Sequence, residues 1–374
     1  MLKPRSTAST QETTLLKTLR SSSVSAFRSW VSVAHKRTQS PVLDVYAPKD
    51  QSSVHALGET PSSANSQRAT VYREPGRGRT PTIVLGGFVP DACDQVFLMR
   101  RMLLAAGDVY YVNYPRSHFS IEAIFAQLDE LVTDLNRSQQ YPVIFGVSFG
   151  AGVLLQWLRA RSQTNAPFST LAGLVLVSPV ACLEDVISNT STKPATLLGR
   201  ALAPFLNPHR PLTDTNLEKS RLVFKRMFDA GAKNGKALHR LLSTQDVIRL
   251  RANVSACIQT ITMTGSIERV RALTSMSPLT EGFSPSLPPL SKAPTIILFA
   301  ENEEAVLDAK SPTRFALEHA TRAYFSNGRV EHVVSRTLDN PVQHASLIFH
   351  AYDFLDHLQG FYREVRPAKL PIAA

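Results

Sequence analysis

Hydrophobic residues along the chain form two patterns, short continuous runs and longer stretches with helical spacing. Continuous runs are typical of strands that are covered on both faces, as in a parallel sheet flanked by helices. Such runs lie at residues 81–88, 108–114, 143–145, 171–177 and 294–300, with shorter strand candidates at 42–46, 69–72 and 330–336. Apolar residues with helical spacing lie between them, at 97–106, 121–135, 151–158 and 345–365. The alternation predicts an α/β fold with a doubly wound, mostly parallel sheet and right-handed crossovers.

The alternation stops after Pro179, and the next hundred residues or so contain helical segments without a convincing strand. These segments lie at 195–206, 217–230, 235–242, 246–250 and 254–262, and a Pro- and Ser-rich stretch at 284–290 leads back to the sheet. An inserted helical block of this size predicts a cap over the carboxyl ends of the strands, where open α/β sheets bind ligands. We therefore expect a basic tail at 1–41, a core formed by 42–181 and 291–366, an α-helical cap at 182–290 and a short tail at 367–374.

One motif at the junction of a predicted strand and helix carries candidate chemistry. Ser148 lies between Gly146 and Gly150, in the pattern G-x-S-x-G, and the apolar run 143–145 stops at Gly146. In this motif, the nucleophile elbow, a strand turns sharply into a helix and holds the serine at the tip. The glycines are expected because the turn brings neighbouring backbone segments close. The backbone N–H of Phe149 then lies at a helix N-terminus, where it can face a developing oxyanion.

With this motif in place, the chain resembles the α/β-hydrolase family over roughly Val71 to Arg366, interrupted by the cap. The family's triad follows the chain order serine, acid, histidine. A serine hydroxyl needs a base to remove its proton. His344, between the last predicted strand and the last predicted helix, is identified as that base, with Ser148 as the nucleophile.

The resemblance also indicates the other members of the site. The loop after the run 294–300 is similar to the family's acid loop and puts Glu303 where an aspartate usually stands. Asp308, five positions later, is the alternative acid, and Asp185 is a third candidate. The oxyanion donors are expected to be the N–H groups of Phe149 and Phe88. In the loop that carries Phe88, many family members have His-Gly, where this chain has Gly-Gly-Phe.

The resemblance implies a serine hydrolase that cleaves carboxylic esters or thioesters through an acyl-enzyme on Ser148. Phe88, Phe149 and Trp157 near the elbow, with apolar cap segments such as 196–206, predict an apolar acyl group. No cofactor and no metal ion is expected. Acyl transfer with the same triad, and a non-catalytic binding protein with the same fold, are the alternative functions.

Charge changes the picture mainly at the N-terminus. The net charge is +11, and residues 1–40 contribute +6 of it, with seven Lys or Arg residues and one acid. A basic tail without a zinc-finger, RNP-type or basic-zipper signature argues against nucleic-acid binding. Apolar residues at 15–34 share one side of a helical wheel, in a segment rich in Ser and Arg. This segment is similar to an organelle transit peptide or to a helix on a membrane surface.

Cysteine usage and hydropathy add two limits. Three scattered cysteines without a C-x-x-C pair argue against a disulfide framework or a structural zinc site, and favour a reducing compartment. No stretch approaches the roughly 20 apolar residues of a membrane-spanning helix. We therefore expect a cytoplasmic protein, with organelle targeting or peripheral membrane contact through residues 1–40 as the alternatives.

Overall fold

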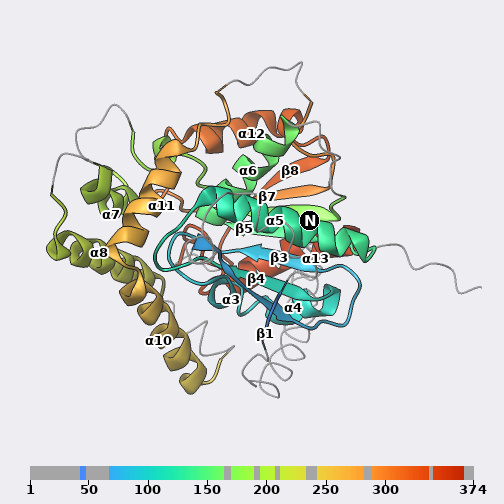
Figure 1. Cartoon of the computed structure of the whole chain (residues 1–374), viewed down its shortest axis with the longest axis horizontal. Helices are drawn as coiled ribbons and strands as arrows, with labels where there is room; N and C mark the ends of the chain where they lie inside the picture. Colours follow the sequence, from blue (N-terminus) through green and yellow to red (C-terminus); the bar gives the residue numbers. More distant parts are fainter. Residues whose placement is uncertain are drawn as a thin grey trace, which may run out of the picture.

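The computed structural model describes residues 43–47, 67–163, 170–188, 194–206, 211–232, 242–281, 288–336 and 340–365. Within these ranges eight strands form one sheet, in the order β1-β2-β4-β3-β5-β6-β7-β8 (Figure 1). The strands are β1 Asp44–Val45, β2 Thr70–Glu74, β3 Thr82–Leu85, β4 Val109–Asn113, β5 Val143–Val147, β6 Gly173–Val177, β7 Thr295–Ala300 and β8 Gly328–Val333. From β4 to β8 all neighbouring strands are parallel, and the two pairings at the other end of the sheet, β1 with β2 and β2 with β4, are antiparallel. The prediction of a doubly wound, mostly parallel α/β sheet is confirmed.

The central strands are buried along their whole length. Every residue of β3, β5, β6 and β7 is buried, so both faces of the sheet are covered, which is why these strands read as continuous apolar runs. The register pairs Leu85 with Gly146, and Val177 with both Val147 and Leu298. The loops that follow these four strands therefore emerge side by side at the carboxyl edge of the sheet.

The helices that accompany the sheet partly follow the sequence pattern. They are α3 Ala92–Gln95, α4 Arg100–Ala106, α5 Ile121–Arg137, α6 Phe149–Ser162, α12 Pro312–Tyr324 and α13 Ala351–Glu364. Helix α5 begins as the pattern predicts, with the Ser120 side chain accepting a hydrogen bond from the N–H of Ala123 at 3.2 Å. The helix expected at 97–106 begins at Arg100, preceded by the separate short helix α3, and α12 was not predicted.

Two predicted boundaries are wrong. The last strand, expected at 330–336, spans Gly328–Val333 because it pairs residue by residue with β7, whose last residue, Ala300, lies opposite Val333. The last helix, expected to begin at Ala345, begins at Ala351. Ala345 has a φ of 48°, a left-handed conformation that a right-handed helix does not admit.

Four further helices gather beside the sheet at one end, and we call them the helical block (Figure 1). They are α7 Leu197–Leu206, α8 Asp214–Ala232, α10 Thr244–Thr260 and α11 Met263–Ser275. The segments expected at 246–250 and 254–262 form the single helix α10, because Val247, Leu250, Val254 and Ile258 are buried on one continuous face. Helix α11 was not predicted.

Some sequence-based expectations lie outside the described residues. These are the N-terminal tail with its amphipathic segment, nearly all of the helix expected at 235–242, most of the Pro- and Ser-rich stretch and the C-terminal tail. None of the helices in the described part of the chain combines the length and apolar character needed to cross a membrane.

Candidate active site

The turn between β5 and α6 holds Ser148 in a strained conformation. Ser148 has φ 52° and ψ −116°, which few non-glycine residues adopt. Its N–H donates to the carbonyl of Val177 at 2.8 Å, and its carbonyl accepts from the N–H of Val180 at 3.1 Å. A Cβ atom on Gly150 would lie 2.3 Å from the carbonyl oxygen of Gly86, and one on Gly146 2.6 Å from the Cα of Ala151. The two glycines of the motif are therefore required by close backbone packing.

A chain of hydrogen bonds joins Ser148, His344 and Glu303. The Ser148 Oγ lies 2.8 Å from the His344 Nε2, and the His344 Nδ1 bonds the Glu303 Oε2. An ionised carboxylate only accepts hydrogen bonds, so the Nδ1 carries the proton. In the neutral ring the Nε2 is then an acceptor, and the Ser148 hydroxyl donates to it. This arrangement places a base directly on the hydroxyl proton.

Glu303 is held from its other side by buried groups. It is 1% exposed, and its Oε1 accepts from the Ser178 hydroxyl at 2.6 Å and from the N–H of Ala300 at 2.6 Å. The same Ser178 hydroxyl accepts from the N–H of Ala345 at 3.1 Å. One side chain therefore contacts both the acid and the backbone next to His344. Sequence reasoning missed Ser178, although its place directly after β6 was a signal.

The other two acid candidates lie in separate networks. The Asp308 Oδ1 accepts from the N–H of Lys310 at 2.9 Å. Asp185 is fully buried and accepts from the Ser311 hydroxyl at 2.6 Å and from the N–H of Ala181 at 2.8 Å. Burial raises the pKa of Asp185. Both carboxylates fix loops next to the site, and the structure joins only Glu303 of the three to His344.

Two backbone N–H groups beside Ser148 are available to a ligand. Among the described residues, no hydrogen-bond partner is found for the N–H of Phe88 or of Phe149. Phe88 lies in the loop after β3 and Phe149 begins α6, and their rings pack edge to face at 5.2 Å. The preceding N–H, of Gly87, donates to the buried Gln95 side chain at 2.6 Å, which orders this loop. The sequence analysis did not predict this role of Gln95.

Arg269, from α11, reaches this loop from the helical block. It is 1% exposed, and its guanidinium donates to the carbonyl of Phe88 and, at 2.9 Å, to that of Pro115. It also lies 5.8 Å from the centres of the Tyr114 and Phe119 rings. Burial, reinforced by the charge of Arg116, lowers the pKa of Arg269 to about 10, so it is a buried cation at neutral pH.

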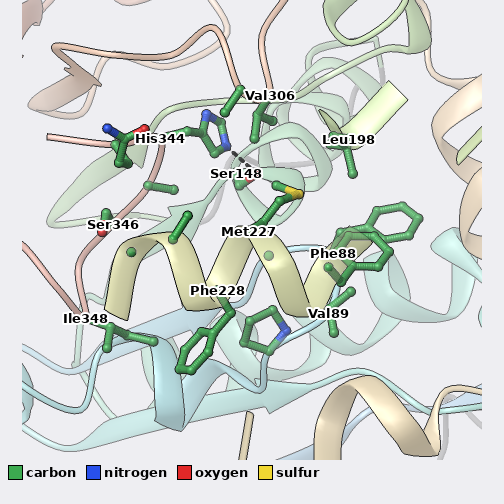
Figure 2. Close-up of a pocket in the computed structure, with 18 of the residues that line it drawn as sticks. Phe88, Val89, Ser148, Leu198, Met227, Phe228, Val306, His344, Ser346 and Ile348 are labelled. Carbon is green, nitrogen blue, oxygen red and sulfur yellow. Dashed lines mark hydrogen bonds between the residues drawn. The ribbon is translucent and has the colours of Figure 1, made fainter. Parts of the chain in front are cut away.

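A cavity of about 250 Å³ opens onto Ser148 and His344 (Figure 2). Its walls are mainly apolar and come from the loop after β3, from α7, α8 and α10, and from the segment after His344. Apolar members include Phe88, Leu198, Phe224, Met227, Phe228, Val254, Ile258, Val306, Ile348 and Phe349. None of the described lining residues is Asp, Glu, Lys or Arg. Trp157, expected to add to this surface, instead lies in the core and donates to Asp129 at 2.9 Å.

One group of metal-ligand types occurs in the described residues, formed by Asp91, Asp94 and Cys257. Arg116 donates to Asp91 at 2.7 Å and to the Cys257 sulfur at 3.0 Å. Burial, with the charge of Asp91 second, raises the pKa of Asp94 to about 6. A guanidinium already bonds two of the three members of the cluster, so the donor set fits an ion pair better than a bound cation.

Comparisons with known proteins find similarity in structure alone. No family model matches the sequence. No curated protein matches it. Among solved structures, a membrane phospholipase A, a bacterial virulence factor, is similar with a TM-score of 0.53 at 13% identity, over 95% of this chain and 93% of that one. An epoxide hydrolase from Bacillus megaterium is similar with a TM-score of 0.52 at 11% identity, over 79% of this chain and 97% of that one.

Proposed function

Because the chain has the α/β-hydrolase fold, we propose that it is a serine hydrolase with Ser148 as nucleophile, His344 as base and Glu303 as acid. The observation that carries this proposal is the hydrogen-bond chain from the Ser148 hydroxyl through the imidazole to the buried carboxylate. The similar solved structures named as a phospholipase and an epoxide hydrolase support hydrolysis as the reaction class.

In the proposed reaction the His344 Nε2 takes the Ser148 proton while the Oγ attacks the carbonyl carbon of the substrate. The N–H groups of Phe149 and Phe88 stabilise the resulting oxyanion. The bond to the leaving oxygen or sulfur then breaks, and the imidazolium gives its proton to the leaving group. A water molecule, deprotonated by the same imidazole, then attacks the acyl carbon; the bond from this carbon to the Ser148 Oγ breaks, the imidazolium returns its proton to the Oγ, and the carboxylic acid leaves. Glu303 keeps the ring in the correct tautomer and stabilises the imidazolium.

The cavity supports carboxylic esters or thioesters with an apolar acyl part as the substrates. Charged lining residues are lacking among those described, so a charged acyl chain would lose its hydration without gaining a partner. In this proposal the helical block acts as the cap, because α8 and α10 form the wall opposite Ser148. Peripheral membrane contact through residues 1–40 stays a prediction for the tail.

A fluorophosphonate probe tests the proposal directly. The folded protein should be labelled at Ser148, and Ser148→Ala should abolish labelling and reduce ester turnover by about 10⁴-fold or more. Ser346→Ala is the matched control, because Ser346 lines the same cavity. The Ser346→Ala protein should still be labelled at Ser148. Folded protein that the probe does not label, or equal turnover by Ser148→Ala, would contradict the proposal.

A further inference from the structure

A second, smaller cavity lies behind the first, inside the helical block. It encloses about 20 Å³ and is formed mainly by side chains of α7, α8, α10 and α11. Four residues line both cavities and therefore form the partition between them: Phe88, Val89, Phe224 and Ile258. The larger cavity, on the Ser148 side, ends at this partition.

The partition is built around two stacked aromatic rings. The rings of Phe88 and Phe224 lie 6.0 Å apart between centres, with their planes inclined by 12°. Phe88 is fixed from the other side, because its ring packs on Phe149 and Arg269 bonds its carbonyl. Phe224 comes from α8, and among the described residues its ring stacks on Phe88 alone. It is therefore the part of the partition that can be shortened while the contacts of Phe88 with Phe149 and Arg269 are kept.

We infer, on the basis of the proposed hydrolase function, that Phe224 determines the length of acyl chain the site accepts. A cavity of about 150 Å³ holds benzene, so about 250 Å³ suits an unbranched apolar acyl group of about eight carbons. A longer chain meets the stacked rings. Arg221 also lines the smaller cavity; its two terminal nitrogens donate to Glu218 and, at 2.7 Å, to the carbonyl of Ile261, while its Nε has no partner among the described residues.

Removal of the Phe224 ring would join the two cavities and add the space of the ring itself. Each further methylene buried contributes about fourfold to kcat/KM, since its transfer from water is worth about 0.8 kcal/mol. Phe224→Ala should therefore raise the ratio of kcat/KM for dodecanoyl over butanoyl nitrophenyl ester at least about tenfold. Phe224→Leu should raise it less. Phe315→Ala, which truncates an exposed ring on α12, is the matched control and should leave the ratio unchanged.

A binding measurement separates this inference from the proposed chemistry. In the Ser148→Ala background, dodecanoate should bind at least about tenfold more tightly when Phe224→Ala is added, by titration calorimetry. An unlabelled, inactive wild type would overturn the proposed function, while the calorimetry would still decide the role of Phe224. An unchanged ester ratio and unchanged dodecanoate affinity in folded Phe224→Ala and Phe224→Leu would overturn the inference.

Discussion

In the sheet, the four central strands are buried at every position, whereas in the helical block α8, α10 and α11 each bury some positions and expose others. Ser148, Glu303 and His344 all stand on loops at the carboxyl edge of the sheet, held by backbone contacts such as the bond from the Ser148 N–H to Val177. The helical block contributes side chains of the cavity wall, such as Met227 and Phe224. If the proposed function holds, the position of the triad depends on backbone packing, whereas the shape of the substrate cavity depends on side chains of the helical block.

The largest expected effect is on the acid at the edge of the sheet. Glu303→Gln should lower kcat by about 10⁴-fold, because an amide that donates toward the Nδ1 favours the wrong tautomer of His344. Asp308→Asn is the control and should change kcat by less than about threefold, since the Asn amide oxygen can still accept from the Lys310 N–H and Asp308 does not bond His344. Steady-state kinetics on proteins with equal circular dichroism compares the two. An equal loss in both variants would contradict the separate roles of the two carboxylates.

Low pH should destabilise the folded protein through His350, which lies at the start of α13. Burial lowers the pKa of His350 to about 4, against an unfolded value of 6.5. Between these values the unfolded chain binds more protons, so the contribution of His350 to the free energy of unfolding decreases as the pH falls, by up to about 3 kcal/mol. Urea unfolding at pH 7 and pH 4.5 measures this loss, which should be smaller in His350→Gln.

The raised pKa of Asp94, about 6, acts with the opposite sign in the same pH range, because its folded form retains the proton that the unfolded form releases. The informative quantity is therefore the difference in free energy of unfolding between wild type and His350→Gln at each pH. A difference that does not vary with pH would show that His350 does not govern the acid sensitivity of the core.

A smaller effect is expected at Ser178, which bonds Glu303 without touching a substrate. Ser178→Ala should lower kcat by about 10- to 100-fold, since a hydrogen bond to a charged group is worth about 1.5–3 kcal/mol. Ser311→Ala removes the same kind of bond from Asp185 and should lower stability while leaving kcat unchanged. Kinetics and thermal unfolding of both variants separate positioning of the acid from simple stabilisation.

The smallest expected effect lies on the helical block side. Figure 2 shows Met227 reaching from α8 into the cavity on the side of Ser148. Met227→Ala should raise KM for an octanoyl ester by about fivefold, the loss of part of a buried side chain, with kcat nearly unchanged. A fall in kcat of more than tenfold would show that the helical block also positions the reacting groups.

Sequence patterns predicted the sheet better than the helical block, for a physical reason. Buried strands need apolar residues at every position, so β3, β5, β6 and β7 stand out in the sequence. The buried face of α11 instead carries Gly265, Ser266 and Arg269, which dilute its apolar periodicity. In α12 the large apolar residue Phe315 is 60% exposed, so its pattern does not indicate the buried face.

The site shows the same division between local and long-range information. The chain order of serine, acid and histidine led to three residues that the structure joins by hydrogen bonds, and their catalytic role stays a prediction. The contact of Ser178 with Glu303 joins residues 125 positions apart. No periodicity reports such a contact, because it depends on the register of neighbouring strands.

The bond from Arg269 to the carbonyl of Phe88 links the access of solvent to the cavity with the position of the loop that carries the Phe88 N–H. Any displacement of α11 that admits bulk solvent would break this bond and release the loop that carries one oxyanion donor. An open form would then be wet but inactive, and a closed form active but sheltered. In the proposed enzyme, the acyl intermediate would be shielded from bulk solvent as long as the Arg269 guanidinium holds the loop that carries the Phe88 N–H.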